Sequence, residues 1–207
     1  IDNGSTDNCT LTLSLDDTDF DCTDLGDNTV TLTGTDESGN TTAVTATVTV
    51  EDSISPIIVV SDITLELGAD GTANLTADTN WDEDIYANST ENCTIQSLNF
   101  DVGGGGDFDC TDLGDNIVNT YIVDQSGNES EVVAVTVTVV DNIAPTVVTQ
   151  DITVQLDANG SASITTADID NGSTDNCTLT LSLDDTDFDC TDLGDNTVTL
   201  TGTDESG

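Results

Sequence analysis

One stretch of the chain sets a pattern that recurs along it. Residues 7–39 read DNCTLTLSLDDTDFDCTDLGDNTVTLTGTDESG. Residues 1–39 and 169–207 are identical at every position, and a diverged copy of the pattern lies between them. The cysteine of an Asn-Cys pair recurs every 84 residues, at Cys9, Cys93 and Cys177. A long period repeated this faithfully is typical of an array of small domains.

Apolar residues within this stretch alternate with threonine and serine. Leu11, Leu13 and Leu15 alternate with polar residues, as do Val30 and Leu32 farther on. Because successive side chains of a strand point to opposite faces, this alternation predicts half-buried β-strands. Residues 36–40 contain a glycine and predict a hairpin turn. We find no helical period of useful length, so the chain is predicted to be all-β.

Two proline-ended linkers predict the domain boundaries. They are residues 51–56, EDSISP, and residues 141–145, DNIAP. They divide the chain into residues 1–55, the later part of one repeat, residues 56–144, a complete repeat, and residues 145–207, the first part of the next. The complete repeat predicts about seven strands, with residues 57–60 as the first, a long loop at 76–91 and a glycine-rich hairpin loop at 103–106. This pattern is typical of an immunoglobulin-like β-sandwich, here in tandem repeats of about 80–90 residues.

The charge of the chain has one sign. There are 42 aspartates and glutamates and no lysine, arginine or histidine, so the formal net charge is −42. Phosphate binding needs basic side chains, which excludes nucleic acid and anionic membrane surfaces as partners. No apolar run is long enough to insert into a membrane. Bound calcium would relieve the repulsion between carboxylates; the alternative is a solvated acidic surface screened by salt.

Six cysteines occur as one pair in each copy, which predicts disulfides and an oxidising, extracellular setting. The predicted pairs are Cys9 with Cys22, Cys93 with Cys110, and Cys177 with Cys190. A bond between Cys9 and Cys22 would close a short hairpin. In the chain-entropy model, closing a loop of this size stabilises the folded state by roughly 3 kcal/mol. A cysteine-only zinc site lacks the usual CxxC spacing. Reduced, buried cysteines are the remaining alternative.

The linker acids and the loop acids of each repeat are predicted to meet at the joint between domains. Hard oxygen ligands from several segments suit calcium, which would stiffen the joint. The residues around the first linker are Asp52, Asp82, Asp84, Glu91 and Asp124, and those around the second are Asp141, Asn142, Asp170, Asp175 and Asp204. A turn at the other end of each domain is expected to face the next linker with Asp24, Asp27, Asp112 and Asp115. Many such aspartates only cap turns, which is the alternative reading for each of them.

The middle copy differs on one strand face. Ile117 and Tyr121 replace threonines that face outward in the first copy. Exposed apolar area often marks a contact, so these two residues are a candidate interface with another domain or chain. Ordinary surface variation is the alternative.

Catalysis lacks the residue types that it needs. The chain has no histidine or lysine to act as a base and no nucleophile with a partner, so we expect no enzyme. A glycan-binding site would need grouped exposed aromatics, for which Trp81, Tyr86 and Tyr121 are the candidates.

The order of these motifs resembles a known family. Asp-Asn-Cys, Phe-x-Cys, Leu-Gly-x-Asn-x-Val and Thr-Asp-x-Ser-Gly, followed by a valine- and threonine-rich strand and a proline-ended linker, are similar to hyalin-type (HYR-like) repeats, and most similar to those of giant bacterial surface and gliding-motility adhesins. The linkers also resemble, more weakly, the calcium-binding linkers of cadherins. The resemblance implies an immunoglobulin-like fold, an extracellular location and a role in adhesion. The chain departs from the family in lacking every basic residue.

These observations predict a secreted structural segment of a filament or adhesin stalk, stapled by disulfides and stiffened by calcium. Its partners would be further repeats of the same chain, with other copies in a laterally packed filament as an alternative. A ligand-binding module for a glycan or a surface is the second alternative.

Overall fold

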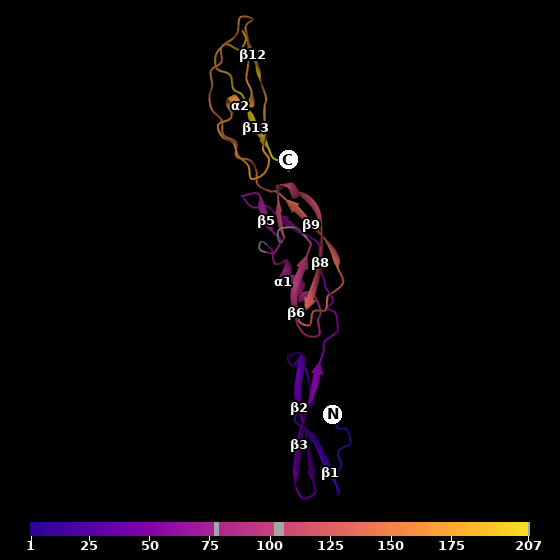
Figure 1. Cartoon of the computed structure of the whole chain (residues 1–207). Coiled ribbons are helices and arrows are strands. Elements are labelled where there is room, and N and C mark those ends of the chain that lie inside the picture. Colours follow the sequence, from indigo (N-terminus) through magenta and orange to yellow (C-terminus); the bar gives the residue numbers. More distant parts are fainter. Residues whose placement is uncertain (77–78, 102–105, 207) are drawn as a thin grey trace. The chain divides into compact units, whose positions relative to one another are not determined.

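The computed structural model describes residues 1–76, 79–101 and 106–206 (Figure 1). Most of the predicted glycine-rich loop lies outside these residues. The chain divides into two compact units. One comprises Ile1–Val59, Asn88–Asn99 and Tyr121–Val132, and the other comprises Val60–Ala87, Phe100–Thr120 and Val133–Gly207. The repeat boundaries inferred from the sequence stay a prediction.

The first copy of the pattern forms a three-stranded antiparallel sheet. Its strands, in the order β1-β2-β3, are β1 (Leu11–Leu15), β2 (Gly26–Asp36) and β3 (Thr41–Val50). Val30 and Leu32 are buried on one face, as their alternation predicted. Leu13 is partly open to solvent, so the predicted apolar face of β1 is only partly covered.

The middle copy and the residues before it form two sheets. Their strands are β4 (Ile63–Glu66), β5 (Thr72–Asn74), β6 (Ile95–Phe100), β7 (Asp107–Asp109), β8 (Gly114–Asp124) and β9 (Val133–Val140). The larger sheet has the order β4-β9-β8-β6, with β4 parallel to β9, and β5 pairs with β7 in the smaller sheet. Leu65, Val118 and Val137 are almost fully buried in the core. This mostly β architecture with several small sheets confirms the predicted fold class, although the strand expected at residues 57–60 forms only a bridge between Ile57 and Thr90.

A helix replaces the predicted long loop, which corrects that prediction. α1 (Trp81–Asn88) carries three acids in its first turn, where the helix dipole favours negative charge. Trp81 and Ile85 stand four residues apart on one face and are buried. The ring of Trp81 meets that of Phe100 edge-on, at 6.0 Å between centroids. The sequence analysis missed this helix because one pair of apolar residues four apart does not establish a helical period.

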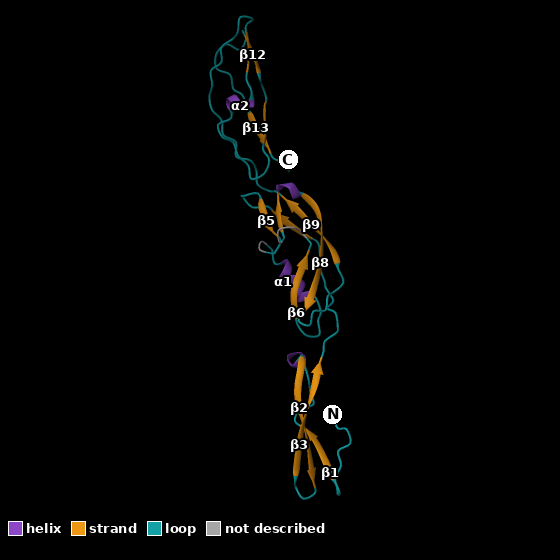
Figure 2. Cartoon of the chain, in the orientation of Figure 1, coloured by secondary structure: helices purple, strands orange, loops and turns teal. Residues whose placement is uncertain are grey.

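The last copy has short strands joined by long loops, as Figure 2 shows. β10 (Ser161–Ser163) pairs with β12 (Asp187–Asp189), and β11 (Thr180–Leu183) pairs with β13 (Leu200–Thr203). A one-turn helix, α2 (Thr166–Ile169), lies between β10 and β11. Ile164, Ile169 and Leu200 form a small buried cluster.

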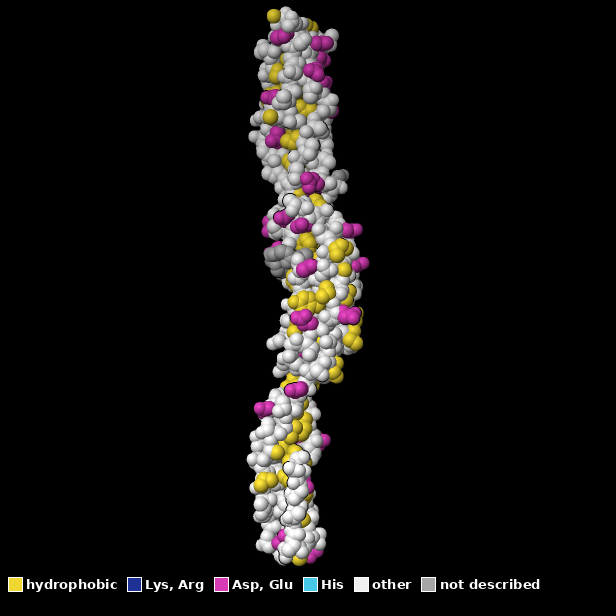
Figure 3. Space-filling model, turned by 45° about the vertical axis from the view of Figure 1, so that its right-hand side comes forward, with side chains coloured by type: hydrophobic (Ala, Val, Ile, Leu, Met, Phe, Trp, Pro, Cys, Tyr) yellow, Lys and Arg dark blue, Asp and Glu magenta, His cyan; other side chains and the backbone are white. Residues whose placement is uncertain are grey.

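The surface reflects the composition. Figure 3 shows carboxylates scattered over the visible face with no basic side chain among them. Within the described residues, no helix has the length and apolar character needed to cross a membrane.

The disulfides join different copies of the pattern, so the predicted pairing within each copy is wrong. Cys22 is bonded to Cys93, and Cys110 to Cys177, with Cα–Cα distances of 5.4 and 5.6 Å. Cys9 and Cys190 are free and exposed. Each bond closes a loop of about 70 residues. In the chain-entropy model this closure stabilises the folded state by ~4 kcal/mol, which is more than closure of the predicted short loops would contribute.

The pairing follows from the turn that carries the first cysteine of each bond. Cys22 and Cys110 begin the 3-10 helices η1 (Cys22–Asp24) and η3 (Cys110–Asp112). An aspartate before each helix accepts hydrogen bonds from the backbone and side chain of a threonine, and an aspartate at its end accepts from the backbone in return. This reciprocal cap holds the cysteine on a rigid turn. The turn lies against the Asn-Cys segment of the next copy instead of its own.

We expect Cys93→Ser to destabilise the unit that contains it by about 2–5 kcal/mol, because the long-range loop closure is lost. The number of thiols titrated in denaturant without reductant should rise by one. Thermal unfolding and a thiol titration check both expectations.

Cys9→Ser is the matched control, since Cys9 occupies the same place in its copy and is free. It should remove one thiol and leave the unfolding temperature unchanged. Equal destabilisation by both variants would restore the pairing of Cys9 with Cys22.

Candidate functional site

A buried aspartate at a hairpin turn anchors the first candidate site. Asp124 ends β8 and is fully buried. Its Oδ1 accepts hydrogen bonds from the backbone N–H groups of Ser126 and Asn128, and its Oδ2 accepts from the Asn128 side chain. Burial acts to raise the pKa of this carboxyl, but the hydrogen bonds, led by those from Asn128, outweigh it and hold the pKa below its ordinary value. Asp124 is therefore a buried carboxylate that stays ionised.

Two further carboxylates approach Asp124 from other segments. Asp52 comes from the linker, where its Oδ1 accepts from the Ile54 backbone and its own carbonyl accepts from the Asn128 side chain. Glu91 precedes an Asn-Cys pair and accepts through Oε1 from the backbone of Asn92 and Cys93. One oxygen of each of the three carboxylates lies within 4.8 Å of those of the other two. These three residues, Asp52, Glu91 and Asp124, are called the first site below.

The three carboxylate oxygens of the first site are close enough together to bind one divalent cation. Calcium binds oxygens at roughly 2.3–2.6 Å, so two ligands of one ion lie at most about 5 Å apart. Oδ2 of Asp52 and Oε2 of Glu91 are buried and have no hydrogen-bond partner. Buried carboxylate oxygens left unpaired are costly, and the chain has no basic side chain to neutralise them. The residues present therefore fit a hard divalent cation.

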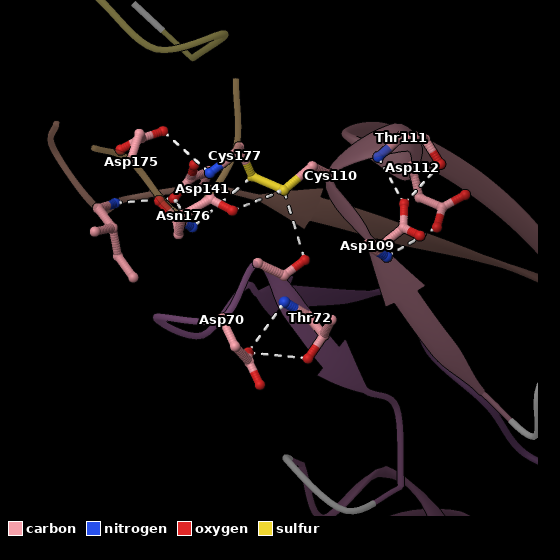
Figure 4. The surroundings of a disulfide bond; sticks show 12 residues. Asp70, Thr72, Asp109, Cys110, Thr111, Asp112, Asp141, Asp175, Asn176 and Cys177 are labelled. Atoms are coloured by element: carbon pink, nitrogen blue, oxygen red, sulfur yellow. Dashed lines mark hydrogen bonds between the residues drawn. A yellow bond between two sulfur atoms is a disulfide. The ribbon is translucent and has the colours of Figure 1, made fainter. Parts of the chain in front are cut away.

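A second group lies at the counterpart position around the next linker. Asp141 is 6 % exposed, and its Oδ2 is buried without a partner, as are Oδ1 of Asp175 and Oδ1 of Asn176. The Asn176 side chain donates to Oδ1 of Asp141 and to the Gly68 carbonyl. Figure 4 shows these side chains gathered beside the disulfide between Cys110 and Cys177. Asp141, Asp175 and Asn176 are called the second site; carboxylate and amide oxygens are both calcium ligands.

Each site lies next to a disulfide in the sequence. Glu91 stands two residues before Cys93, and Asp175 stands two residues before Cys177. Glu91 of the first site, and Asp175 and Asn176 of the second, thus lie in the same three-residue segment as a bonded cysteine. The Cys22 sulfur is 3.4 Å from the Asn92 carbonyl oxygen, which places the η1 turn beside this segment.

The other acids predicted around the linkers have different contacts. Asp82 and Asp84 lie in the first turn of α1, and their role as ligands stays a prediction. Asn142 donates to Glu66, and Asp170 accepts from the Ser173 backbone. Asp204 stands at the counterpart position of Asp124 in the last copy, and its role as a ligand stays a prediction.

The four turn acids make structural hydrogen bonds. Asp24 and Asp112 accept from the backbone in the caps of η1 and η3. Asp27 and Asp115 accept from Thr49 and Thr138 on the neighbouring strands. These contacts match the alternative in which such aspartates cap turns, and a metal-binding role for these residues stays a prediction.

The remaining predicted site residues separate into exposed and buried ones. Ile117 is 63 % exposed and Tyr121 is half-buried, so the interface proposed for them stays a prediction. Trp81, a candidate for sugar stacking, is buried in the core.

Sequence reasoning missed two asparagines of the sites. Asn176 contributes an oxygen to the second site, and Asn128 orients both Asp124 and Asp52 in the first. The signal was present, because asparagine precedes the cysteine in every copy and ends the turn after Asp36 and Asp124.

Comparisons with known proteins add little detail. No protein-family model and no curated protein matches the chain. Among solved structures it is similar to the protocadherin gammaB7 EC3-6 cis-dimer structure, with 15 % sequence identity and a TM-score of 0.32, over 87 % of this chain and 57 % of that one. It is also similar to protocadherin gamma B7 extracellular cadherin domains 1-4, with 13 % identity and a TM-score of 0.29, over 86 % and 52 % of the two chains. The chain thus spans little more than half the length of either solved chain.

We expect Asp124→Asn to destabilise its unit by about 1–3 kcal/mol at neutral pH, because an amide cannot accept the three hydrogen bonds in the same way. The folded pKa of Asp124 is below the unfolded one, so its contribution is present above about pH 4 and is lost as the pH falls through the folded pKa. The variant should therefore lose less stability than the parent on acidification. Urea unfolding from pH 7 to 2.5, with chelator present, measures this.

Glu37→Gln is the matched control, because Gln125 already stands at its counterpart position in the turn after Asp124. It removes one exposed charge and should change neither stability nor its acid dependence. A flat pH profile in the parent would contradict the role given to Asp124.

Proposed function

We propose that this chain is an extracellular structural segment of an adhesion-type protein, in which bound calcium and disulfides together lock successive repeats. The observation that carries the proposal is the first site. Asp52 from the linker, Glu91 from the Asn-Cys segment and Asp124 from a hairpin turn present oxygens to one point. A cation held there would connect three segments that the backbone alone leaves independent.

The charge of the chain gives the cation its energetic role. Carboxylates gathered at the linkers repel one another, and no internal cation offsets them. A divalent ion would convert this repulsion into attraction at the points where flexibility between repeats is expected. The disulfide beside each site would hold the ligand loop in place when the ion is absent.

An extracellular location is supported by the disulfides. Bonds between distant, sequence-repeated cysteines persist in oxidising compartments and are rare in reducing ones. The function that follows is mechanical: to extend, bridge and display. The chain resembles HYR-type adhesin repeats only in the order of its motifs.

The alternatives have different support. A glycan-binding module loses one of its three aromatic candidates, because Trp81 is buried against Phe100. A laterally packed filament is favoured by the exposure of Ile117 on β8.

We expect calcium to bind at two sites in isothermal titration calorimetry. Asp52→Asn or Glu91→Gln should weaken the first by roughly tenfold or more, and Asp141→Asn should do the same to the second, since affinity follows the number of charged ligands. Glu37→Gln is the control for a lost charge and should leave both sites intact. Equal effects of all four variants would mean that calcium is attracted only by the overall negative charge and does not occupy specific sites.

We expect small-angle X-ray scattering to show a stiffer particle with calcium and a more flexible one with excess chelator. The double variant Asp52→Asn, Asp141→Asn should give the chelator profile under both conditions. A parent profile that does not change would support the screened acidic surface instead.

A further inference from the structure

One carboxylate of each candidate cation site has its two oxygens in different surroundings. Oε1 of Glu91 accepts a hydrogen bond from the backbone N–H of Cys93, and Oδ2 of Asp175 accepts one from the backbone N–H of Cys177. The other oxygen of each carboxylate is buried and has no hydrogen-bond partner among the described residues. Figure 4 shows the second of these pairs beside its disulfide. The backbone of a bonded cysteine therefore sets the direction of the oxygen that is left for a cation.

The other end of the first disulfide is anchored where the first linker leaves its sheet. Cys22 begins the capped turn η1, which leads into β2. Gly26, the first residue of β2, pairs with Val50 at the end of β3, and Asp52 follows two residues later. The disulfide therefore ties the segment that carries Glu91 to the end of the sheet that carries Asp52.

The second disulfide repeats this arrangement. Cys110 begins the capped turn η3, which leads into β8. Gly114, the first residue of β8, pairs with Val139 in β9, and Asp141 again follows two residues after the paired valine. At both sites, a disulfide thus connects the Asn-Cys segment to the strand end that carries the linker acid.

The ligands of the first site have little reason to meet without this bond. Asp52 and Glu91 lie far apart in the sequence and carry the same charge, so they repel one another when no cation is bound. A cation that had to gather them from a mobile chain would lose binding free energy to the ordering of that chain. A bond that holds the ligands in place beforehand removes this cost and raises the affinity.

We propose that the disulfide beside each cation site controls the calcium affinity of that site. Oxidation of the cysteine pair assembles the site, and reduction weakens its hold on the cation. Because binding free energies are linked, bound calcium must in turn make the disulfide harder to reduce, by the same factor. This inference rests on the proposed calcium sites. The chain would then bind calcium tightly only in an oxidising compartment, where its disulfides persist.

A dithiol such as dithiothreitol supplies the two electrons for reduction of the first disulfide. One of its thiolates attacks the Cys93 sulfur, forms a mixed disulfide and releases the Cys22 thiolate. The second thiolate of the reductant then attacks its own sulfur in the mixed disulfide and releases the Cys93 thiolate. The two cysteine thiolates take up the two protons that the dithiol lost. One protein disulfide is reduced to two thiols, and one dithiol is oxidised to a cyclic disulfide.

The first test compares two double variants of the full chain, Cys22→Ser with Cys93→Ser and Cys110→Ser with Cys177→Ser. Each double variant removes one disulfide and retains the other. In isothermal titration calorimetry with calcium, we expect the first to weaken only the first site and the second to weaken only the second site, each by roughly tenfold or more. Each double variant serves as the control for the other.

The second test uses the parent chain, so it does not depend on the folding of the cysteine variants. The chain is equilibrated in buffers of reduced and oxidised dithiothreitol, with saturating calcium or with chelator, and each disulfide is quantified by alkylation and mass spectrometry. We expect calcium to raise, by the same factor as in calorimetry, the ratio of reduced to oxidised reagent at which half of each disulfide is reduced. Asp52→Asn should abolish this shift for the bond between Cys22 and Cys93 and retain it for the bond between Cys110 and Cys177.

Three outcomes would contradict these expectations. Two calcium sites in the parent that keep their affinity after loss of the disulfides, with reduction unaffected by calcium, would overturn the inference and leave the proposed function standing. Equal weakening of both sites by either double variant would overturn it too, because the disulfides would then act only on the stability of the whole fold. No saturable calcium binding by the parent would overturn the proposed function itself.

Discussion

The structure depends on one constraint: a chain with 42 acids and no basic side chain must satisfy every carboxylate without an ion pair. Most aspartates of the chain are stabilised without an ion pair, because they accept hydrogen bonds from backbone N–H groups and hydroxyls at turns. The side chain and backbone of Asn40 lower the pKa of Asp36 in this way, and those of Thr111 lower the pKa of Asp109. Buried oxygens without partners remain in the two linker groups, at Asp52 and Glu91 and at Asp141, Asp175 and Asn176. The linkers are thus where the chain needs something that its own side chains do not supply.

The disulfides and the cation sites support the same segments by different means. A disulfide acts mainly on the unfolded chain by removing loop entropy, and the bonds here close long loops. A cation would act on the folded state by offsetting the repulsion of converging carboxylates. Because Glu91 and Cys93 share one turn, either interaction orders the loop that the other uses, and such coupling is reciprocal.

Much of the fold could be predicted from local pattern. The alternation around Val30 and Leu32 placed a strand and its buried face, and the turn after Asp36 was found from its glycine. Asp52, Glu91 and Asp124 were named from the sequence together with Asp82 and Asp84, and the structure brings the first three together. Calcium binding at this site stays a prediction. The helix α1 was missed because Trp81 and Ile85 provide a single turn of helical spacing, and its burial depends on Phe100, far along the chain.

The sequence by itself determined the repeat, the all-β class, the acidic character and the residue types that could bind a divalent cation. These follow from composition and from spacing within a few residues, where side-chain direction is set by the strand. Only the tertiary structure decided which acids converge and which cysteines pair. Cys22 is 13 residues from Cys9 and 71 from Cys93, yet it bonds the more distant one. The capped η1 turn holds Cys22 against the Asn-Cys segment of the next copy. Distance in the sequence does not predict which surfaces come into contact.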